Sequence, residues 1–268
     1  MLTTNPFDDD KLHEECGVFG IWGADNAASF VALGLHALQH RGQEGAGITS
    51  FDGKHFHSHR AMGHVAGNFD RDEIIRMLAG RSAIGHVRYS TAGGPGLRNV
   101  QPLFAELAEG GFALAQNGNL SNALKLRRTL NRRGSIFQST SDTEVIIHLV
   151  ATSDYTTTLD RLTDALKQVE GAYSLVVLTD DGLIACRDPL GIRPCQVSVM
   201  PDGNYVWNAE AIKIWSHRLK WSPYCDMSVK APRQKSEKSS ALLPQRQPDQ
   251  PKRADDDAPP GEQRETVT

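Results

Sequence analysis

The chain has 268 residues, of which 39% are hydrophobic and 23% charged, and its formal net charge is −3. That length holds one domain of ordinary size or two small ones. The small net charge gives no electrostatic reason to expect a nucleic acid or an anionic membrane surface as partner. Residues 1–11 are polar and acidic, and no stretch approaches the roughly 20 apolar residues of a membrane span. We therefore expect neither a signal peptide at the start of this sequence nor a membrane-spanning helix.

Elements are predicted in chain order from hydrophobic periodicity and from glycines that punctuate it. The predicted strands are 18–22, 47–51, 83–87, 112–116, 173–179 and 183–187, and the predicted helices are 27–38, 121–133 and 159–169. Gly134 follows the second helix, where glycine is the usual residue. Ser141 and Glu144 have the spacing of a capping box before the apolar run 145–150. Strands in runs, with helices between the runs, favour layered sheets covered by helices.

The hydrophobic periodicity and the composition of the sequence change after Pro194. Residues 195–225 hold three of the four tryptophans but show no clear period of 2 or 3.6. Residues 226–268 are rich in Lys, Arg, Gln, Asp, Ser and Pro and have almost no apolar side chains. Because such a segment buries too little surface to offset its ordering entropy, it is predicted to be disordered. We therefore expect the domain to end at residue 194.

The cysteines show neither the paired spacing nor the density of a disulfide scaffold, and they are Cys16, Cys186, Cys195 and Cys225. A reducing, cytoplasmic location fits this usage best. Cys16 opens the apolar segment 16–20, where a cysteine taken alone is usually a small buried hydrophobe. A thiol can instead attack an amide carbonyl if a base removes its proton. A free α-amine, with a pKa of about 7.7–8.0, can serve as that base.

Six short segments carry a resemblance to a known family. They are Cys16-Gly-Val-Phe-Gly20, Gln39-His-Arg-Gly-Gln-Glu-Gly-Ala-Gly47, Gly85-His-Val-Arg-Tyr-Ser-Thr-Ala-Gly93, Gln116-Asn-Gly-Asn-Leu120, Thr140-Ser-Asp-Thr-Glu144 and Arg187-Asp-Pro-Leu-Gly-Ile-Arg-Pro194. In this order and spacing the chain resembles, over about residues 12–194, the glutaminase domain of amidophosphoribosyltransferase, an enzyme of purine synthesis. The resemblance implies an α+β fold, the four-layer αββα sandwich of N-terminal nucleophile (Ntn) hydrolases. We expect this sandwich to lack its last strands here.

The resemblance also implies roles for individual residues. Cys16 corresponds to the nucleophile, and since it is internal, a propeptide of residues 1–15 must be cleaved after Glu15. Arg88 corresponds to the arginine that holds the glutamine α-carboxylate, which a planar guanidinium can bind through two parallel hydrogen bonds. Without the family pattern, Arg88 would be interpreted as a surface charge at a strand end. Asp142 corresponds to the carboxylate that receives the substrate ammonium, or is an ordinary acidic residue in a first helical turn.

Asn117 and Gly118 correspond to the oxyanion hole, through the asparagine side-chain amide and the glycine backbone N–H. The alternative for Asn-Gly is a tight hairpin turn. Arg41 matches a loop position of the family motif and is expected to order the site. Other Ntn amidotransferases, such as the glucosamine-6-phosphate synthase type, carry Tyr-Arg-Gly-Tyr-Asp and Thr-Arg-Trp where this chain differs. They remain an alternative, as does an inactive, truncated gene product.

Partners and cofactors follow from the same comparison. Glutamine is the expected substrate, and the full-length family forms homo-oligomers. Past residue 194 no match to the family's phosphoribosyltransferase domain is apparent, so we expect that domain to be absent and the transferase step to be lost. Magnesium and the iron–sulfur cluster of some members would belong to that part, and no cofactor is expected here. His55, His57 and His59 have a spacing compatible with a metal, but a solvated strand face is favoured because no carboxylate was expected nearby.

Overall fold

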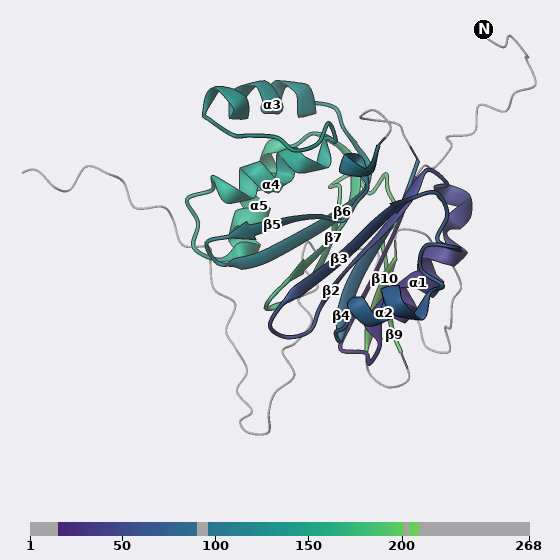
Figure 1. The fold of residues 1–268 in the computed structure, drawn as a ribbon. Helices are drawn as coiled ribbons and strands as arrows, with labels where there is room; N and C mark the ends of the chain where they lie inside the picture. The colour runs from purple at the N-terminus through teal and green to yellow at the C-terminus, as the bar shows by residue number, and fades with distance from the viewer. Residues whose placement is uncertain (1–15, 90–95, 201–203, 209–268) are drawn as a thin grey trace, which may run out of the picture.

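The computed structural model describes residues 16–89, 96–200 and 204–208. Two antiparallel sheets face each other, and helices cover the outer face of each (Figure 1). Helices α1 and α2 lie over one sheet, and α3, α4 and α5 lie over the other, at the opposite side of the molecule in this view (Figure 1). The four-layer αββα sandwich implied by the family motifs is confirmed.

The first sheet has six strands in the order β3-β2-β4-β1-β10-β9, and all neighbours are antiparallel. Its strands are β1 (Gly17–Trp22), β2 (Gly45–Phe51), β3 (Phe56–Met62), β4 (Ser82–Arg88), β9 (Gln196–Val199) and β10 (Tyr205–Asn208). The second sheet has four strands in the order β5-β6-β7-β8. Its strands are β5 (Leu103–Leu107), β6 (Gly110–Leu120), β7 (Gly171–Thr179) and β8 (Gly182–Arg187).

The helices follow the sequence prediction closely where the apolar period is strong. They are α1 (Ala27–Ala37), α2 (Asp72–Met77), α3 (Ala123–Arg132), α4 (Thr143–Ala151) and α5 (Thr158–Gln168), with short 3₁₀ turns η1 (Gln39–Arg41) and η2 (Leu97–Asn99). Gly134 has φ of 98° just past α3, the left-handed conformation in which glycine is least strained. The six-residue α2 was not predicted, because fewer than two helical turns carry too little periodicity, and the strand β5 was also missed.

Three apolar clusters correspond to the three spaces between the four layers. One lies between the first sheet and α1–α2, one between the second sheet and α3–α5, and one between the two sheets. Since side chains alternate across a strand, Val18 and Ile84 point into the space between the sheets while their neighbours point to the helices. The same alternation decides which polar residues enter this central space.

The segment after residue 194 corrects the expected end of the domain. Strands β9 and β10 lie beyond that position, and β10 pairs with β1 along Phe19↔Asn208 to Trp22↔Tyr205. Trp207 is fully buried in the cluster between the sheets. Four-residue strands show no visible period, which is why the sequence pattern missed them. The proposed propeptide, Cys225 and the predicted disordered segment 226–268 lie outside the described residues.

The predicted capping box also forms differently. Asp142 is the N-cap residue of α4, and the Glu144 carboxylate accepts hydrogen bonds from the backbone N–H groups of Gln138 and Ser139 at 2.6 and 2.7 Å. Glu144 therefore anchors the preceding loop instead of the start of its own helix. Across the described ranges, no helix is both long and apolar enough to cross a bilayer.

Candidate functional site

The backbone of Cys16 is fixed by Arg41. The Cys16 N–H donates to the Arg41 carbonyl oxygen at 2.9 Å, and the Arg41 Nε donates to the Cys16 carbonyl oxygen at 2.8 Å. Arg41 belongs to η1 and is buried. These two hydrogen bonds hold the backbone of Cys16 at its nitrogen and at its carbonyl, and the expected role of Arg41 in ordering a catalytic site stays a prediction. Cys16 itself has φ of 72°, in the left-handed region that residues with a Cβ adopt at an energetic cost.

The thiol of Cys16 lies against the backbone of Tyr89. Its Sγ is 3.3 Å from the Tyr89 carbonyl oxygen, to which the thiol donates, and the Tyr89 N–H donates to Sγ at 3.4 Å. The pairing of β1 with β4 explains this contact, because Gly17 is opposite Val87 and the next residues along the two strands are Cys16 and Arg88. The start of β1 and the end of β4 therefore meet at one end of the sandwich.

Arg88 ends β4 and is only 3% exposed, which excludes its interpretation as a surface charge. Its Nη1 donates to the Asn99 carbonyl oxygen at 3.1 Å. The Asn99 side chain in turn bonds Thr140, through Nδ2 to Oγ1 at 2.8 Å and through Oδ1 from the Thr140 N–H at 2.9 Å. The guanidinium is thus tied through Asn99 to the loop that leads into α4.

Asp142 lies at the start of α4, beside the end of β6. Its Oδ2 accepts a hydrogen bond from the Leu120 N–H at 2.8 Å. Burial raises the pKa of the Asp142 carboxyl above its ordinary value, although the Leu120 N–H and the positive charge of Arg88 act in the opposite direction. Arg88 is linked through Asn99 to Thr140, two residues before Asp142, so the two opposite charges lie in one region. A ligand with a carboxylate and an ammonium group on one carbon carries the complementary pair of charges.

Asn117 and Gly118 lie inside β6, so the hairpin-turn interpretation is wrong. They pair with Ser174 and Tyr173 of β7. The Asn117 amide is fully buried, and neither its Nδ2 nor its Oδ1 has a hydrogen-bond partner in the part of the chain that the structure describes. Gly118 has φ of 140°, and a Cβ added there would collide with the Ala172 carbonyl oxygen. This position therefore requires glycine.

Strand parity brings these polar groups into the central space. On β4, Arg88 shares the inward face with Ile84 and His86, and on β6, Asn117 shares it with Ala113 and Ala115. The His86 Nε2 lies 3.2 Å from the Gln116 carbonyl oxygen and joins the two sheets. Cys16 and the end of β4 are therefore on the same side of the sandwich interior as Asn117.

His86 is the residue of this region to which sequence reasoning assigned no role. It is fully buried, and burial together with the positive charge of Arg88 lowers its pKa to about 3. The imidazole is consequently neutral at any physiological pH. The sequence feature that could have identified His86 is its position two residues before Arg88 in the same strand, which puts both side chains on one face of the sheet.

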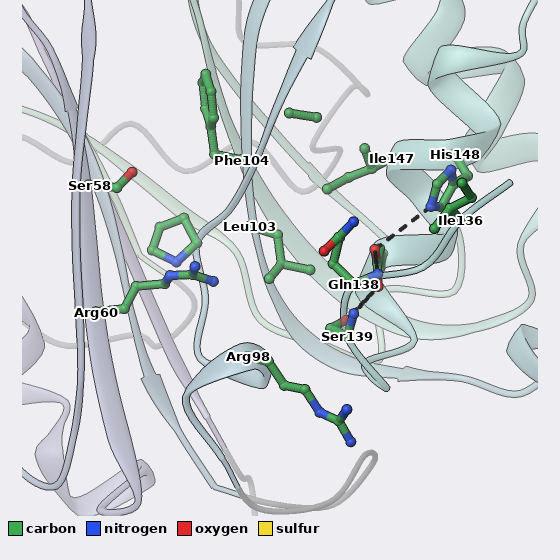
Figure 2. Close-up of a pocket in the computed structure, with 13 residues that line it drawn as sticks. Ser58, Arg60, Arg98, Leu103, Phe104, Ile136, Gln138, Ser139, Ile147 and His148 are labelled. Atoms are coloured by element: carbon green, nitrogen blue, oxygen red, sulfur yellow. Dashed lines mark hydrogen bonds and ion pairs between the residues drawn. The ribbon is translucent and has the colours of Figure 1, made fainter.

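A cleft of about 540 Å³ lies elsewhere, between β3, β5 and the start of α4. Figure 2 shows Arg60 on one side of it and Ile147 and His148 on the other. Glu144 on its wall is already engaged by the loop that it anchors. None of the six site residues expected from the sequence lines this cleft, so it is separate from the candidate site.

The histidines around β3 have a neighbour that the sequence analysis did not place there. The Asp52 carboxylate lies 2.8 Å from the His57 Nε2 and 3.9 Å from the His55 Nδ1, while the ring of His59 packs edge-on against Phe69. The expectation that no carboxylate lies near these histidines was wrong. His57 and His59 share one face of β3, and at His59 this face is partly covered by Phe69 of the α1–α2 layer.

Comparisons with known proteins identify the family of this chain. A family model described as "Glutamine amidotransferase domain" matches residues 88–215. The chain is 55% identical over 208 residues to an amidophosphoribosyltransferase of Rhizobium etli, covering 78% of this chain and 42% of that protein. It is 50% identical to an amidophosphoribosyltransferase of Lacticaseibacillus casei, covering 72% of this chain and 99% of that sequence. The chain thus spans about two fifths of the Rhizobium relative and nearly all of the Lacticaseibacillus sequence.

A solved structure extends the match to the fold. The glutamine phosphoribosylpyrophosphate amidotransferase of Bacillus subtilis, complexed with ADP and GMP, superposes with a TM-score of 0.68 at 44% identity, covering 72% of this chain and 42% of that one. High identity, the same sandwich and near-complete coverage of one relative lead to a single conclusion: this chain belongs to the amidophosphoribosyltransferase family, of which it carries the glutamine amidotransferase domain.

Proposed function

We propose that this domain hydrolyses glutamine to glutamate and ammonia, with Cys16 as nucleophile. The observation that supports this most directly is the Asn117 amide, which is fully buried on an inward-facing position and has no partner in the described chain. A buried amide is normally hydrogen-bonded, so an unpaired one on the same side of the sandwich interior as Cys16 supports a ligand oxygen as its missing partner. The polarised Gly118 N–H of the same strand is the second proposed donor.

The proposed reaction balances with groups that the chain and water supply. The Cys16 sulfur forms a bond to the side-chain carbonyl carbon of glutamine, and its proton passes to the α-amine of Cys16. The carbonyl oxygen becomes an oxyanion, which Asn117 and Gly118 stabilise by hydrogen bonds. The amine returns the proton to the leaving nitrogen, which departs as ammonia and leaves a thioester. Water then attacks the thioester and releases glutamate and the thiol, so the proposal includes no metal or redox cofactor.

An α-amine on Cys16 requires cleavage of the Glu15–Cys16 peptide bond. The positive φ of Cys16 shows local backbone strain at this junction, and strained residues cluster at functional sites. The Arg41 carbonyl oxygen accepts the N–H of Cys16 in the uncleaved chain. After cleavage the same carbonyl would hold one N–H of the amine, and the nitrogen lone pair would be available to the thiol.

Arg88 and Asp142 are proposed to bind the α-carboxylate and α-ammonium of glutamine. Arg88 is linked through Asn99 to Thr140 in the loop before Asp142, and Arg88 ends β4 opposite Cys16, which directly precedes β1. Buried charges of opposite sign, facing a ligand that is a zwitterion, select an amino acid over a simple amide. The domain would therefore hydrolyse glutamine in preference to short aliphatic amides.

For this chain we propose only the hydrolysis of glutamine to glutamate and ammonia. In the whole enzymes of the family, ammonia passes to phosphoribosyl pyrophosphate in purine synthesis, but the match covers only about two fifths of the longer relatives. We propose a cytoplasmic location, which suits the sparse cysteines. We also propose that the chain forms homo-oligomers, as the full-length family does.

The test is the intact mass of the purified chain before and after incubation with a diazoketone analogue of glutamine, alongside the Cys16→Ala variant. We expect loss of residues 1–15 and one adduct on Cys16, together with ammonia release from glutamine. The variant should stay at full length and remain unlabelled. A wild-type chain that is neither cleaved nor labelled would show that the fold is present without a working site, which is the competing interpretation of an inactive gene product.

A further inference from the structure

A layer of buried polar side chains lies directly beneath the start of β1, between the two sheets. It consists of His86 on β4, Asn117 on β6 and Ser174 on β7, each with an exposed fraction of 0%. The His86 Nδ1, both polar atoms of the Asn117 amide and the Ser174 Oγ have no hydrogen-bond partner among the described residues. Buried polar atoms are nearly always paired, so four unpaired atoms in one layer require an explanation.

The tautomer of His86 follows from its one recorded hydrogen bond. Its Nε2 faces the Gln116 carbonyl oxygen at 3.2 Å, and a carbonyl oxygen can only accept. The Nε2 therefore carries the hydrogen. Because burial keeps the ring neutral, the Nδ1 has no hydrogen and presents a lone pair. His86 thus offers a fixed acceptor to the layer, and Gln116, to which it is bonded, directly precedes Asn117 in β6.

Ser174 approaches Asn117 from the neighbouring strand. The two residues are direct partners in the β6–β7 register, so their side chains are on the same face of the sheet. Directly opposite residues have Cβ atoms about 4.5–5.5 Å apart, within reach of a hydroxyl and an amide after a change of rotamer. A serine hydroxyl can rotate to donate to an oxygen.

We propose that His86 and Ser174 are positioning residues that set the orientation of the Asn117 amide in the working site. The Ser174 hydroxyl donates to the Asn117 Oδ1, and one Asn117 Nδ2 hydrogen is donated to the His86 Nδ1. The second Nδ2 hydrogen is then directed to the oxyanion. This inference rests on the proposed glutaminase function and adds to it two residues that determine which end of the amide faces the substrate.

The orientation matters because the two ends of an asparagine amide have opposite polarity. With Nδ2 toward the thiol, Asn117 donates to the oxyanion; with Oδ1 there, it would repel that charge. Neither Ser174 nor the His86 Nδ1 touches substrate in this scheme. These hydrogen bonds are not formed in the resting structure, and catalytic hydrogen bonds often form only when substrate is bound.

The experiment compares Ser174→Ala with Ser174→Thr in the full chain. Alanine removes the hydroxyl, and threonine keeps it. Loss of one neutral hydrogen bond in the transition state should lower kcat for glutamine about tenfold in Ser174→Ala, with KM unchanged and most activity restored in Ser174→Thr. Alkylation of Cys16 by iodoacetamide forms no oxyanion, so its rate should be the same in both variants and the wild type.

A second pair tests His86 independently. In His86→Asn the Oδ1 can occupy the place of the Nδ1 and accept. In His86→Gln the longer side chain can keep its Nε2 on the Gln116 carbonyl oxygen, but its Oε1 then does not lie at the Nδ1 position. Expressed relative to the iodoacetamide rate, glutamine hydrolysis should fall further in His86→Gln than in His86→Asn. This ratio removes any general effect of repacking a buried position.

Each outcome decides between distinct conclusions. Wild-type rates in Ser174→Ala, or a loss of hydrolysis and alkylation in equal proportion, would overturn the positioning role, because the second result is that of a purely structural residue. A wild-type chain that releases no ammonia from glutamine and is not labelled by the diazoketone would instead overturn the proposed function, and with it this inference.

Discussion

The Arg41 Nε and the Cys16 carbonyl oxygen lie 2.8 Å apart, and the reciprocal hydrogen bond runs from the Cys16 N–H to the Arg41 carbonyl oxygen at 2.9 Å. The two residues are 25 positions apart in the sequence. This pair holds Cys16 at both its nitrogen and its carbonyl, while the sulfur stays beside Tyr89. Cys16 is therefore held by η1 as well as by β1, which begins at the next residue.

Arg41→Lys should weaken this arrangement while it keeps the positive charge. A charge-assisted hydrogen bond contributes about 1.5–3 kcal/mol, so we expect glutamine hydrolysis to fall about 10- to 100-fold if the bond is equally important in the transition state. Ammonia release and thermal unfolding measure activity and stability separately. Arg76→Lys, an exposed position in α2, is the matched control and should behave as the wild type. Full activity in Arg41→Lys would contradict the ordering role.

Asn117→Ala and Gly118→Ala should separate chemistry from folding. Asn117 has no hydrogen-bond partner in the described residues, so Asn117→Ala should change the free energy of unfolding little. Loss of an oxyanion donor should raise the activation barrier by about 2.7–4 kcal/mol, which lowers kcat about 100- to 1,000-fold. Gly118→Ala should unfold or aggregate, because its Cβ would collide with the Ala172 carbonyl oxygen. Urea unfolding and kcat for glutamine measure the two effects. An Asn117→Ala protein with a wild-type kcat would remove this residue from the mechanism.

Asp142→Asn should stabilise the fold at neutral pH and weaken substrate binding. Burial raises the carboxyl pKa in the folded state, so the folded state binds more protons than the unfolded state, and stability falls as pH rises above the unfolded value. An asparagine has no charge to bury, and its Oδ1 can still accept from the Leu120 N–H. We expect a higher Tm than the wild type at pH 7, little difference near pH 3, and a raised KM for glutamine. A lower Tm at pH 7 would show that the carboxylate stabilises the fold.

His86 should make the fold sensitive to acid. Its pKa is about 3 in the folded state and about 6.5 unfolded, so the unfolded state binds more protons between these values. The contribution of the neutral His86 side chain to the free energy of unfolding is fully present above about pH 6.5 and is lost as the pH falls toward 3. Urea unfolding at pH 7 and pH 4.5 should show a smaller pH difference in His86→Gln than in the wild type. Equal differences in the two proteins would place the acid sensitivity in other groups.

Trp207 tests whether the strands after residue 194 belong to the domain. It is fully buried between the sheets, and its Nε1 donates to the Cys195 Sγ at 2.8 Å. Trp207→Ala should lower the free energy of unfolding by about 3–5 kcal/mol, as is usual for a buried aromatic residue. Val199→Ala, at an exposed position of β9, should stay within about 0.5 kcal/mol of the wild type. A negligible effect of Trp207→Ala would mean that β10 adds little to the fold.

Hydrophobic periodicity over long segments was sufficient to predict much of the secondary structure. The predicted helix 27–38 is α1, and the predicted strands 83–87 and 173–179 lie within β4 and β7. Short elements failed for the same reason, because six residues of α2 or four of β9 span too little of a period to be distinguished from a loop. The Asn-Gly pair shows a different limit, since Asn117 and Gly118 favour a turn locally but lie in an 11-residue strand held by β7 on one side.

The sequence by itself determined the family and the nucleophile candidate, and through the family resemblance the αββα class, because six motifs in register are local information. Only the tertiary structure decided that Arg88 is buried, that His86 is a neutral acceptor and that Ser174 is opposite Asn117. The burial of Arg88, the tautomer of His86 and the register of Ser174 depend on how the strands pair and how the two sheets pack against each other. These properties arise from contacts between segments far apart in the chain, and no local pattern records them.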